Sequence, residues 1–143
     1  MSMLGRCLCG AVQLHVARHS QEMSACHCRM CRRWAGGAML GFLAPKDAVE
    51  VTGPVRLYVS SPLAERAFCG TCGSQLWLRG TGATEDGNLE LSPGLFDGGE
   101  LRLVREIYAD DQPHGLAFVG DHTRVSKQQY EADWPSVDEG DEI

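Results

Sequence analysis

The feature that most constrains this chain is the placement of its seven cysteines among 143 residues. An odd number of cysteines cannot pair off completely into disulfides. The first residues show no basic segment followed by an apolar one, so we predict no secretory signal and a reducing, cytoplasmic location. The cysteines fall into three tight groups, which buried thiols scattered through a core would not do. These groups are Cys7 and Cys9, then Cys26, Cys28 and Cys31, and finally Cys69 and Cys72.

Cysteines two or three residues apart can place two thiolates on one short turn, an arrangement suited to binding zinc. Seven ligands divide most simply into four plus three. A closed site of four thiolates is structural, and its binding free energy, of order 10–16 kcal/mol in small domains, adds to the free energy of folding. Glycines beside these cysteines would let the backbone turn its N–H groups toward sulfur. The set of four is Cys7, Cys9, Cys69 and Cys72, and the glycines are Gly10, Gly70 and Gly73.

The remaining set, Cys26, Cys28 and Cys31, supplies only three ligands. Three protein ligands leave the fourth position of a tetrahedral zinc open, as in catalytic sites. Such an ion can deprotonate a bound water or thiol and polarise a carbonyl group. Three alternatives stay open. A fourth protein ligand could close the site, Cys28 and Cys31 could form a redox pair, or members of the triple could group with the C-x-x-C pair at 69 and 72.

Composition limits the class of partner. Hydrophobic residues make up 43% and charged residues 22%, which is typical of a globular domain. Nineteen acidic against thirteen basic residues give a net charge of −6. Nucleic-acid binding needs clustered Lys and Arg, and the sequence offers only Arg29, Arg32 and Arg33. Apolar runs such as residues 38–44 are too short to cross a bilayer. We therefore expect neither a nucleic acid nor a membrane as partner.

Short strands separated by turn residues dominate the pattern. Helical periodicity is confined to residues 28–35. We predict a mainly β, zinc-pinned domain of short antiparallel strands over residues 1–126, followed by an acidic, mobile tail over residues 127–143. The predicted strands are residues 11–16, 38–44, 55–60, 65–68, 75–79, 89–92 and 101–108.

The three cysteine motifs, in this order, resemble those of the glutathione-dependent formaldehyde-activating enzyme family, which also includes CENP-V-like proteins. The matching motifs are G-x-C-x-C-G at residues 5–10, C-H-C-x-x-C-R at 26–32 and F-C-x-x-C-G at 68–73. The resemblance implies an all-β, zinc-pinned tent fold. It also implies a structural zinc on Cys7, Cys9, Cys69 and Cys72 and a second, catalytic zinc on Cys26, Cys28 and Cys31.

The resemblance further implies an activity, the joining of glutathione to formaldehyde to give S-hydroxymethylglutathione, which is formally a carbon–sulfur lyase reaction run in reverse. The partner would then be a small thiol such as glutathione. The segment after Tyr108 departs from the family pattern, and we expect it to shape the substrate pocket. A non-catalytic zinc module that binds a protein through an exposed sheet edge is the alternative.

Candidate catalytic side chains lie beside the triple. His27 is a candidate proton carrier because histidine titrates near neutral pH. In an extended chain, however, it would point away from its two neighbouring ligands, which favours a supporting or surface role. Arg32, with Arg33, could hold a substrate carboxylate or be solvated, and Trp34 could wall the pocket or simply pack. The other histidines are expected to be structural or solvent-facing: His15, His19, His114 and His122.

Overall fold

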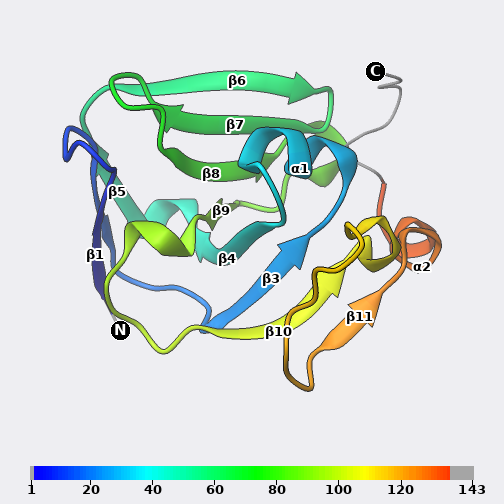
Figure 1. The fold of residues 1–143 in the computed structure, drawn as a ribbon. Coiled ribbons are helices and arrows are strands. Elements are labelled where there is room, and N and C mark those ends of the chain that lie inside the picture. The colour runs from blue at the N-terminus through cyan, green and yellow to red at the C-terminus, as the bar shows by residue number, and fades with distance from the viewer. Residues whose placement is uncertain (1, 136–143) are drawn as a thin grey trace.

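The computed structural model describes residues 2–135 and arranges them as two β-sheets with two short α-helices (Figure 1). The smaller sheet has the order β1-β2-β5, and the larger has the order β11-β10-β3-β4-β9-β8-β7-β6. The strands of the smaller sheet are Met3–Arg6 (β1), Gln13–Val16 (β2) and Val49–Thr52 (β5). Those of the larger sheet are Glu22–Cys26 (β3), Met39–Pro45 (β4), Val55–Ser61 (β6), Ala64–Cys69 (β7), Gln75–Gly80 (β8), Asn88–Leu91 (β9), Arg102–Ile107 (β10) and Thr123–Val125 (β11). The helices are Arg29–Ala35 (α1) and Lys127–Asp133 (α2), with short 3-10 turns at Lys46–Ala48, Gly82–Thr84, Pro93–Leu95 and Ala109–Asp111.

A core of apolar side chains joins the two sheets. Strand β2 turns Leu14 and Val16 inward at alternate positions, as expected of a half-buried strand. Phe42 of β4 and Leu91 of β9 meet them from the larger sheet. The ring of Phe42 also packs edge-on against Phe96, with 5.5 Å between centroids. Burying a side chain of this size contributes roughly 1.5–3 kcal/mol, so these contacts hold the sheets together.

The other face of the larger sheet carries charged side chains. The strand register places Arg66 of β7, Leu78 of β8, Glu90 of β9 and Leu43 of β4 in one row across the sheet. Residues directly opposite each other share a face. The leucines on either side of Glu90 are buried in the core, so the row points away from it. Arg66 and Glu90 therefore lie on the face remote from the core.

The mainly β prediction is confirmed, and every predicted strand overlaps an observed one. The predicted helical residues 28–35 contain α1, which begins where the Sγ of Cys28 accepts a hydrogen bond from the backbone N–H of Cys31. It ends at Gly36, whose φ of 78° is left-handed. The pattern misses strands β1, β3, β5 and β11, which have three to five residues each, although β2 and β9, with four residues each, were predicted. At that length an alternation does not always stand out.

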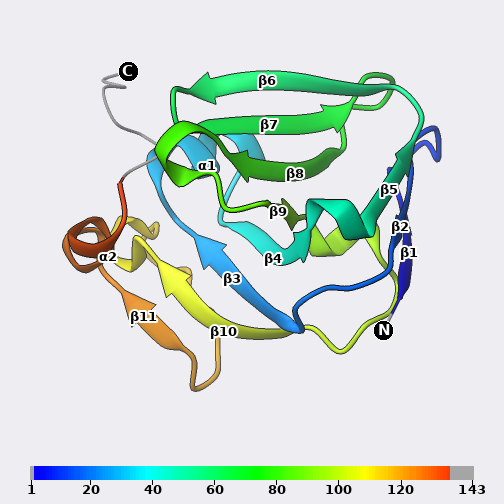
Figure 2. The same cartoon turned by 180° about the vertical axis from the view of Figure 1, so that it is seen from behind.

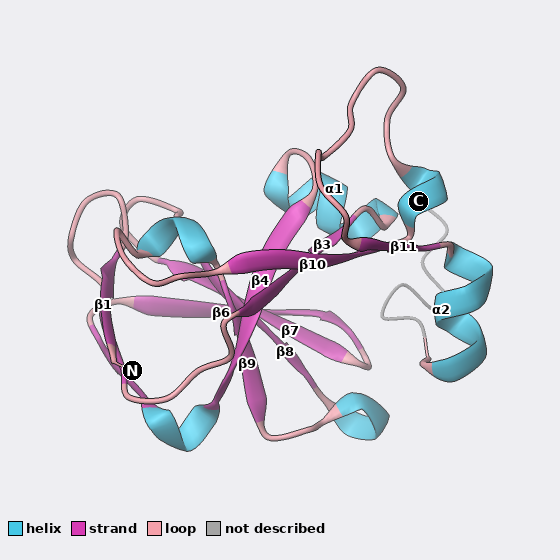
Figure 3. Cartoon of the chain, turned by 90° about the horizontal axis from the view of Figure 1, so that it is seen from below, coloured by secondary structure: helices cyan, strands magenta, loops and turns pink. Residues whose placement is uncertain are grey.

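Strand β10 departs from the predicted antiparallel arrangement, because it runs parallel to both of its neighbours, β3 and β11. All the other strand pairs are antiparallel. A parallel pair needs a long crossover, and β3 and β10 are far apart in sequence, so no local pattern reveals it. The strands of the larger sheet fan out when viewed from below, which shows a strong twist (Figure 3).

The first part of the segment predicted as a mobile tail forms helix α2, which lies beside β11 in both views (Figures 1 and 2). Ser126 and Gln129 form a capping box at its start. Tyr130 then packs against Tyr108, with 5.4 Å between ring centroids. Residues 136–143 of the predicted tail lie outside the described residues. Neither α-helix of the described chain has the length and apolar character needed to cross a bilayer.

Candidate metal centres and an adjoining cavity

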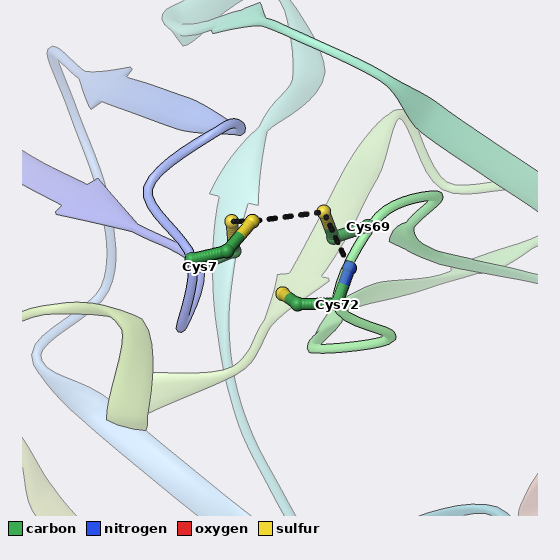
Figure 4. A group of neighbouring side chains, drawn as sticks. Cys7, Cys69 and Cys72 are labelled. Carbon is green, nitrogen blue, oxygen red and sulfur yellow. Dashed lines mark hydrogen bonds between the residues drawn. The ribbon is translucent and has the colours of Figure 1, made fainter.

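Four thiols from two distant segments of the chain converge, as predicted from their spacing (Figure 4). The Sγ atoms of Cys7, Cys9, Cys69 and Cys72 all lie within 4.8 Å of one another. The sulfur of Cys9 is 3.6 Å from that of Cys7 and 3.9 Å from that of Cys69. Four sulfurs bound at about 2.3 Å to a tetrahedral zinc would stand about 3.8 Å apart. The group therefore fits a closed zinc site.

Hydrogen-bond donors point at these sulfurs. The backbone N–H of Val12 donates to Cys7 Sγ at 3.2 Å, and two N–H groups of the following turn each donate to Cys69 Sγ at 3.4 Å. The hydroxyl of Ser74, 3.2 Å from Cys72 Sγ, together with backbone N–H groups lowers the pKa of Cys72 to about 5. These donors stabilise a thiolate, which is the form that binds metal.

The second group gathers where β3 meets α1. Cys26 ends the strand, Cys28 precedes the helix and Cys31 lies in its first turn. All three are buried, and their sulfurs lie within 4.8 Å of one another. Arg66 is also buried, and its two terminal nitrogens lie 3.8 and 3.9 Å from Cys31 Sγ. Its guanidinium lies 5.0 Å from the ring centroid of Trp34. Of the two roles considered for Trp34, this contact supports packing against the cluster around the triple rather than forming a wall of the pocket.

Within residues 2–135, no fourth His, Cys, Asp or Glu joins this triple. The triple and the four-thiol group are also separate, so the alternatives of a closing protein ligand and of a mixed grouping find no support there.

The thiols of the triple differ in the direction in which their pKa is shifted. Hydrogen bonds from Cys26 and Cys28 hold the pKa of Cys31 well below its usual range in spite of burial, and the charge of Arg66 lowers it further. Hydrogen bonds with Cys28 and Cys31, with burial, raise the pKa of Cys26 well above its usual range. Cys31 is thus favoured as a thiolate, and the other thiols of the triple need a further positive charge nearby to lose their protons. Zinc would supply that charge, so the donor set fits the metal.

A cavity of about 240 Å³ lies beside the buried cluster that contains the triple, although none of the three cysteines is among its lining residues. Leu78, Ile107 and Tyr130 line the cavity and also pack against the buried cluster that contains the triple. Glu90 and Arg105 give it one negative and one positive side chain. Because Tyr130 belongs to α2, the segment after Tyr108 supplies part of the wall of this cavity, and whether it shapes a substrate pocket stays a prediction.

His27 lies on the opposite side of β3 from this cavity. It is fully buried, and its Nε2 lies 2.7 Å from a carboxylate oxygen of Glu106. Glu106 pairs in register with Ala25. Successive residues of a strand face opposite sides of the sheet, so Glu106 faces away from Cys26 and from Ile107, the residue of β10 that pairs with Cys26. The second oxygen of Glu106 is bonded by His122. A surface position for His27 is therefore excluded, and its partners could not be predicted because they come from distant segments of the chain.

We expect Glu106→Gln to destabilise the protein by about 3 kcal/mol near neutral pH, because it leaves buried partners without their charge. Burial raises the pKa of Glu106, but hydrogen bonds from His122 and His27 outweigh this and hold it below its ordinary value of 4.5. A carboxyl group whose pKa is lowered by folding stabilises the fold above its unfolded pKa. That contribution is lost as the pH falls through the folded-state pKa.

Urea unfolding of wild type and Glu106→Gln at about pH 7 and about pH 3.5 would measure the destabilisation. The difference in the free energy of unfolding between the two proteins should shrink at the lower pH. Glu50→Gln is the control, since Glu50 is exposed and lies 3.7 Å from His15, and its effect should stay within about 0.5 kcal/mol. A difference that is equally large at both pH values would contradict the expectation.

The arginines predicted beside the triple occupy the outer side of α1. The Nε of Arg32 donates to the carbonyl oxygen of His27 at 2.9 Å. Arg29, Arg32 and Arg33 also line a hollow of about 430 Å³ together with Pro113. The structure thus gives Arg32 a positioning contact, and its predicted role in holding a carboxylate stays a prediction.

Comparisons with known proteins agree with the motifs. Residues 2–111 match the sequence profile of the family described as "Glutathione-dependent formaldehyde-activating enzyme". An uncharacterized lyase of Schizosaccharomyces pombe is 32% identical over 117 residues, covering 80% of this chain and 84% of the relative. A Halomonas elongata protein provisionally named a glutathione-dependent formaldehyde-activating enzyme is 33% identical over 89 residues, covering 54% and 56%. A crystal structure of a Rhodobacter sphaeroides protein shares the fold, with a TM-score of 0.55 at 20% identity over 85% of this chain and 99% of that one.

Proposed function

The chain belongs to the glutathione-dependent formaldehyde-activating enzyme family, and we propose that it is a zinc-dependent carbon–sulfur lyase. The proposed substrate is the glutathione adduct of formaldehyde or of a related small aldehyde. The observation that carries the proposal is the buried triple of Cys26, Cys28 and Cys31 next to a cavity, with no fourth protein ligand within residues 2–135. We assign a structural zinc to the four-thiol group and a catalytic zinc to the triple.

When bound at the triple, zinc would supply a positive centre that favours the thiolate form of a thiol. The residues of the chain would position the reactants and balance their charge. The cavity holds the thiol and the aldehyde close together, and proximity with a well-placed proton suffices for an addition that is already easy. Arg66 offsets the negative charge of the thiolates from inside the protein. Arg105 in the cavity and Arg32 in the separate hollow on the outer side of α1 are proposed to hold carboxylates of the tripeptide.

His27 is proposed to act through its neighbours. It separates two of the proposed ligands in sequence, and the bond from its ring to Glu106 fixes the end of β3 on which Cys26 lies. This supports a positioning role for His27. A direct catalytic role, the other sequence-based hypothesis, would require it to reach substrate from the face opposite the cavity.

The test is to replace zinc by cobalt and record the absorption bands of the metal while glutathione is added. A change in the cobalt bands is expected if the triple has an exchangeable position. S-methylglutathione, which has no free thiol, is the matched control and should leave the bands unchanged. Product formation is then followed by NMR after formaldehyde is added. Bands that glutathione leaves unchanged, with no accelerated product formation, would overturn the proposal.

One observation favours the non-catalytic alternative. Strand β6 forms an outer edge of the larger sheet, and its Leu57, Tyr58 and Val59 are 57%, 61% and 68% exposed. Exposed sheet edges can pair with a strand of another protein. A zinc module of this kind would keep both metals, bind no glutathione and lose a protein partner when β6 is altered.

A further inference from the structure

The side chain of Glu90 extends across the face of the sheet in the direction of the triple. Its strand partner on β4 is Leu43, two residues from Gly41, and Gly41 has no side chain. A Cβ on Gly41 would come within 2.3 Å of Glu90 Cγ and 2.7 Å of its Oε1, so the Glu90 side chain lies directly above that glycine. The next residue of β4 on the same face is Met39, which pairs with Cys26. The carboxylate is therefore directed along β4 toward the strand pair that carries the first ligand of the triple.

The surroundings of Glu90 suit a group that exchanges protons. The residue is half-buried and lines the cavity. Burial raises the pKa of Glu90 above its ordinary value of 4.5, and the charges of Arg105 and Arg66 offset this only in part. Across residues 2–135, no cation forms an ion pair with Glu90 within 4.0 Å. Carboxyl groups with a raised pKa in a cavity are typical of general acids and bases.

The buried histidine next to the triple is less well placed. His27 and its partner Glu106 lie on the face of β3 and β10 opposite to the cavity. Glu90, in contrast, shares its face with Cys26 and with the cavity-lining Leu78. The acidic side chain that a strand of the sheet presents on the cavity face is thus Glu90 of β9.

On the basis of the proposed function, we propose that Glu90 is the catalytic proton carrier for thiol addition to the aldehyde. Its carboxylate accepts the proton of the thiol, and the sulfur electron pair forms the new carbon–sulfur bond. The π pair of the carbonyl group moves to oxygen, and the carboxylic acid returns the same proton to that oxygen. The hydroxymethyl thioether is formed with no net gain or loss of protons, and the reverse sequence is the lyase reaction.

The test compares zinc-loaded wild type with Glu90→Gln, which keeps the size of the side chain above Gly41. Three quantities are measured: zinc per chain, the Kd for S-methylglutathione, and the rate of exchange between glutathione with formaldehyde and the adduct. Exchange should fall about 100-fold or more, within the range for lost acid–base catalysis. Zinc content should be unchanged, and Kd should change less than about threefold. The matched control is Glu65→Gln on β7, which β8 separates from β9; its carboxylate lies on the opposite face, 3.4 Å from Arg79.

The outcomes separate the two proposals. The inference is supported if exchange is lost in Glu90→Gln and kept in Glu65→Gln, while the zinc content and the Kd of Glu90→Gln stay normal. An active wild type with an equally active Glu90→Gln overturns the inference alone. A Kd weakened tenfold or more, or lost zinc, assigns Glu90 to binding or structure and also overturns it. A wild type that neither binds the analogue nor accelerates exchange overturns the proposed function and this inference together.

Discussion

Cys72→Ser should leave the protein largely unfolded at about 25 °C in conditions where the wild type is folded. The proposed structural zinc contributes a binding free energy of order 10–16 kcal/mol in small domains, which is as large as the whole stability of a typical domain. Cys72 is half-exposed, so exchanging its sulfur for oxygen removes little packing. Loss of the metal ligand is then the main consequence of the change.

Circular dichroism and urea unfolding of zinc-loaded wild type and Cys72→Ser would measure this difference. The control is the same comparison after both proteins have been stripped of metal by a chelator. The difference should then nearly vanish, because neither chain retains the ion. If the two proteins differ as much without metal as with it, the role assigned to the four-thiol group is wrong.

Cys28→Ser, in the triple, should have the opposite result: a folded protein with its activity reduced about 1,000-fold or more, equivalent to at least about 4 kcal/mol of transition-state stabilisation. The substitution removes a proposed ligand of the catalytic zinc. It also keeps the start of α1, because Cys28 accepts the N–H of Cys31 there and serine is a favoured residue at this position. The change in the free energy of unfolding should be about 1 kcal/mol.

Zinc analysis, urea unfolding and the exchange rate of glutathione with formaldehyde are measured on the same preparation of Cys28→Ser. One zinc per chain should remain, held by the four-thiol group. Thr52→Ser, at an exposed position of β5 in the smaller sheet, is the control for a small substitution away from the triple. If Cys28→Ser unfolds as thoroughly as Cys72→Ser, the triple is structural and the enzyme proposal loses its basis.

The sequence favoured one grouping of the metal-binding candidates but left a mixed grouping open. Ligands two or three residues apart are already held close by the chain, so their spacing carries most of the information, and the four-plus-three division is confirmed by the distances between sulfurs. Of the three glycines named beside these cysteines, Gly10 and Gly73 have positive φ angles, 81° and 78°, whereas Gly70 does not.

The sequence was not sufficient to identify Arg66 and Glu90. In Leu89-Glu90-Leu91, the alternation shows that Glu90 faces away from the core, and such a residue is usually solvated. What makes Glu90 different is the cavity that α2 closes and the arginines contributed by β7 and β10. Those neighbours depend on the strand order, including the parallel pairing of β10, which no local pattern encodes.

The topology also sets the order in which the two centres can be assembled as the chain emerges from the ribosome. All four thiols of the closed group are present once residue 72 has been made. Strand β3, with Cys26 at its end, gains its parallel neighbour only with Arg102–Ile107, and the far wall of the cavity arrives later still with Tyr130. A nascent chain can therefore complete the four-thiol group before the cavity beside the triple is finished, although the three thiols of the triple are themselves made earlier.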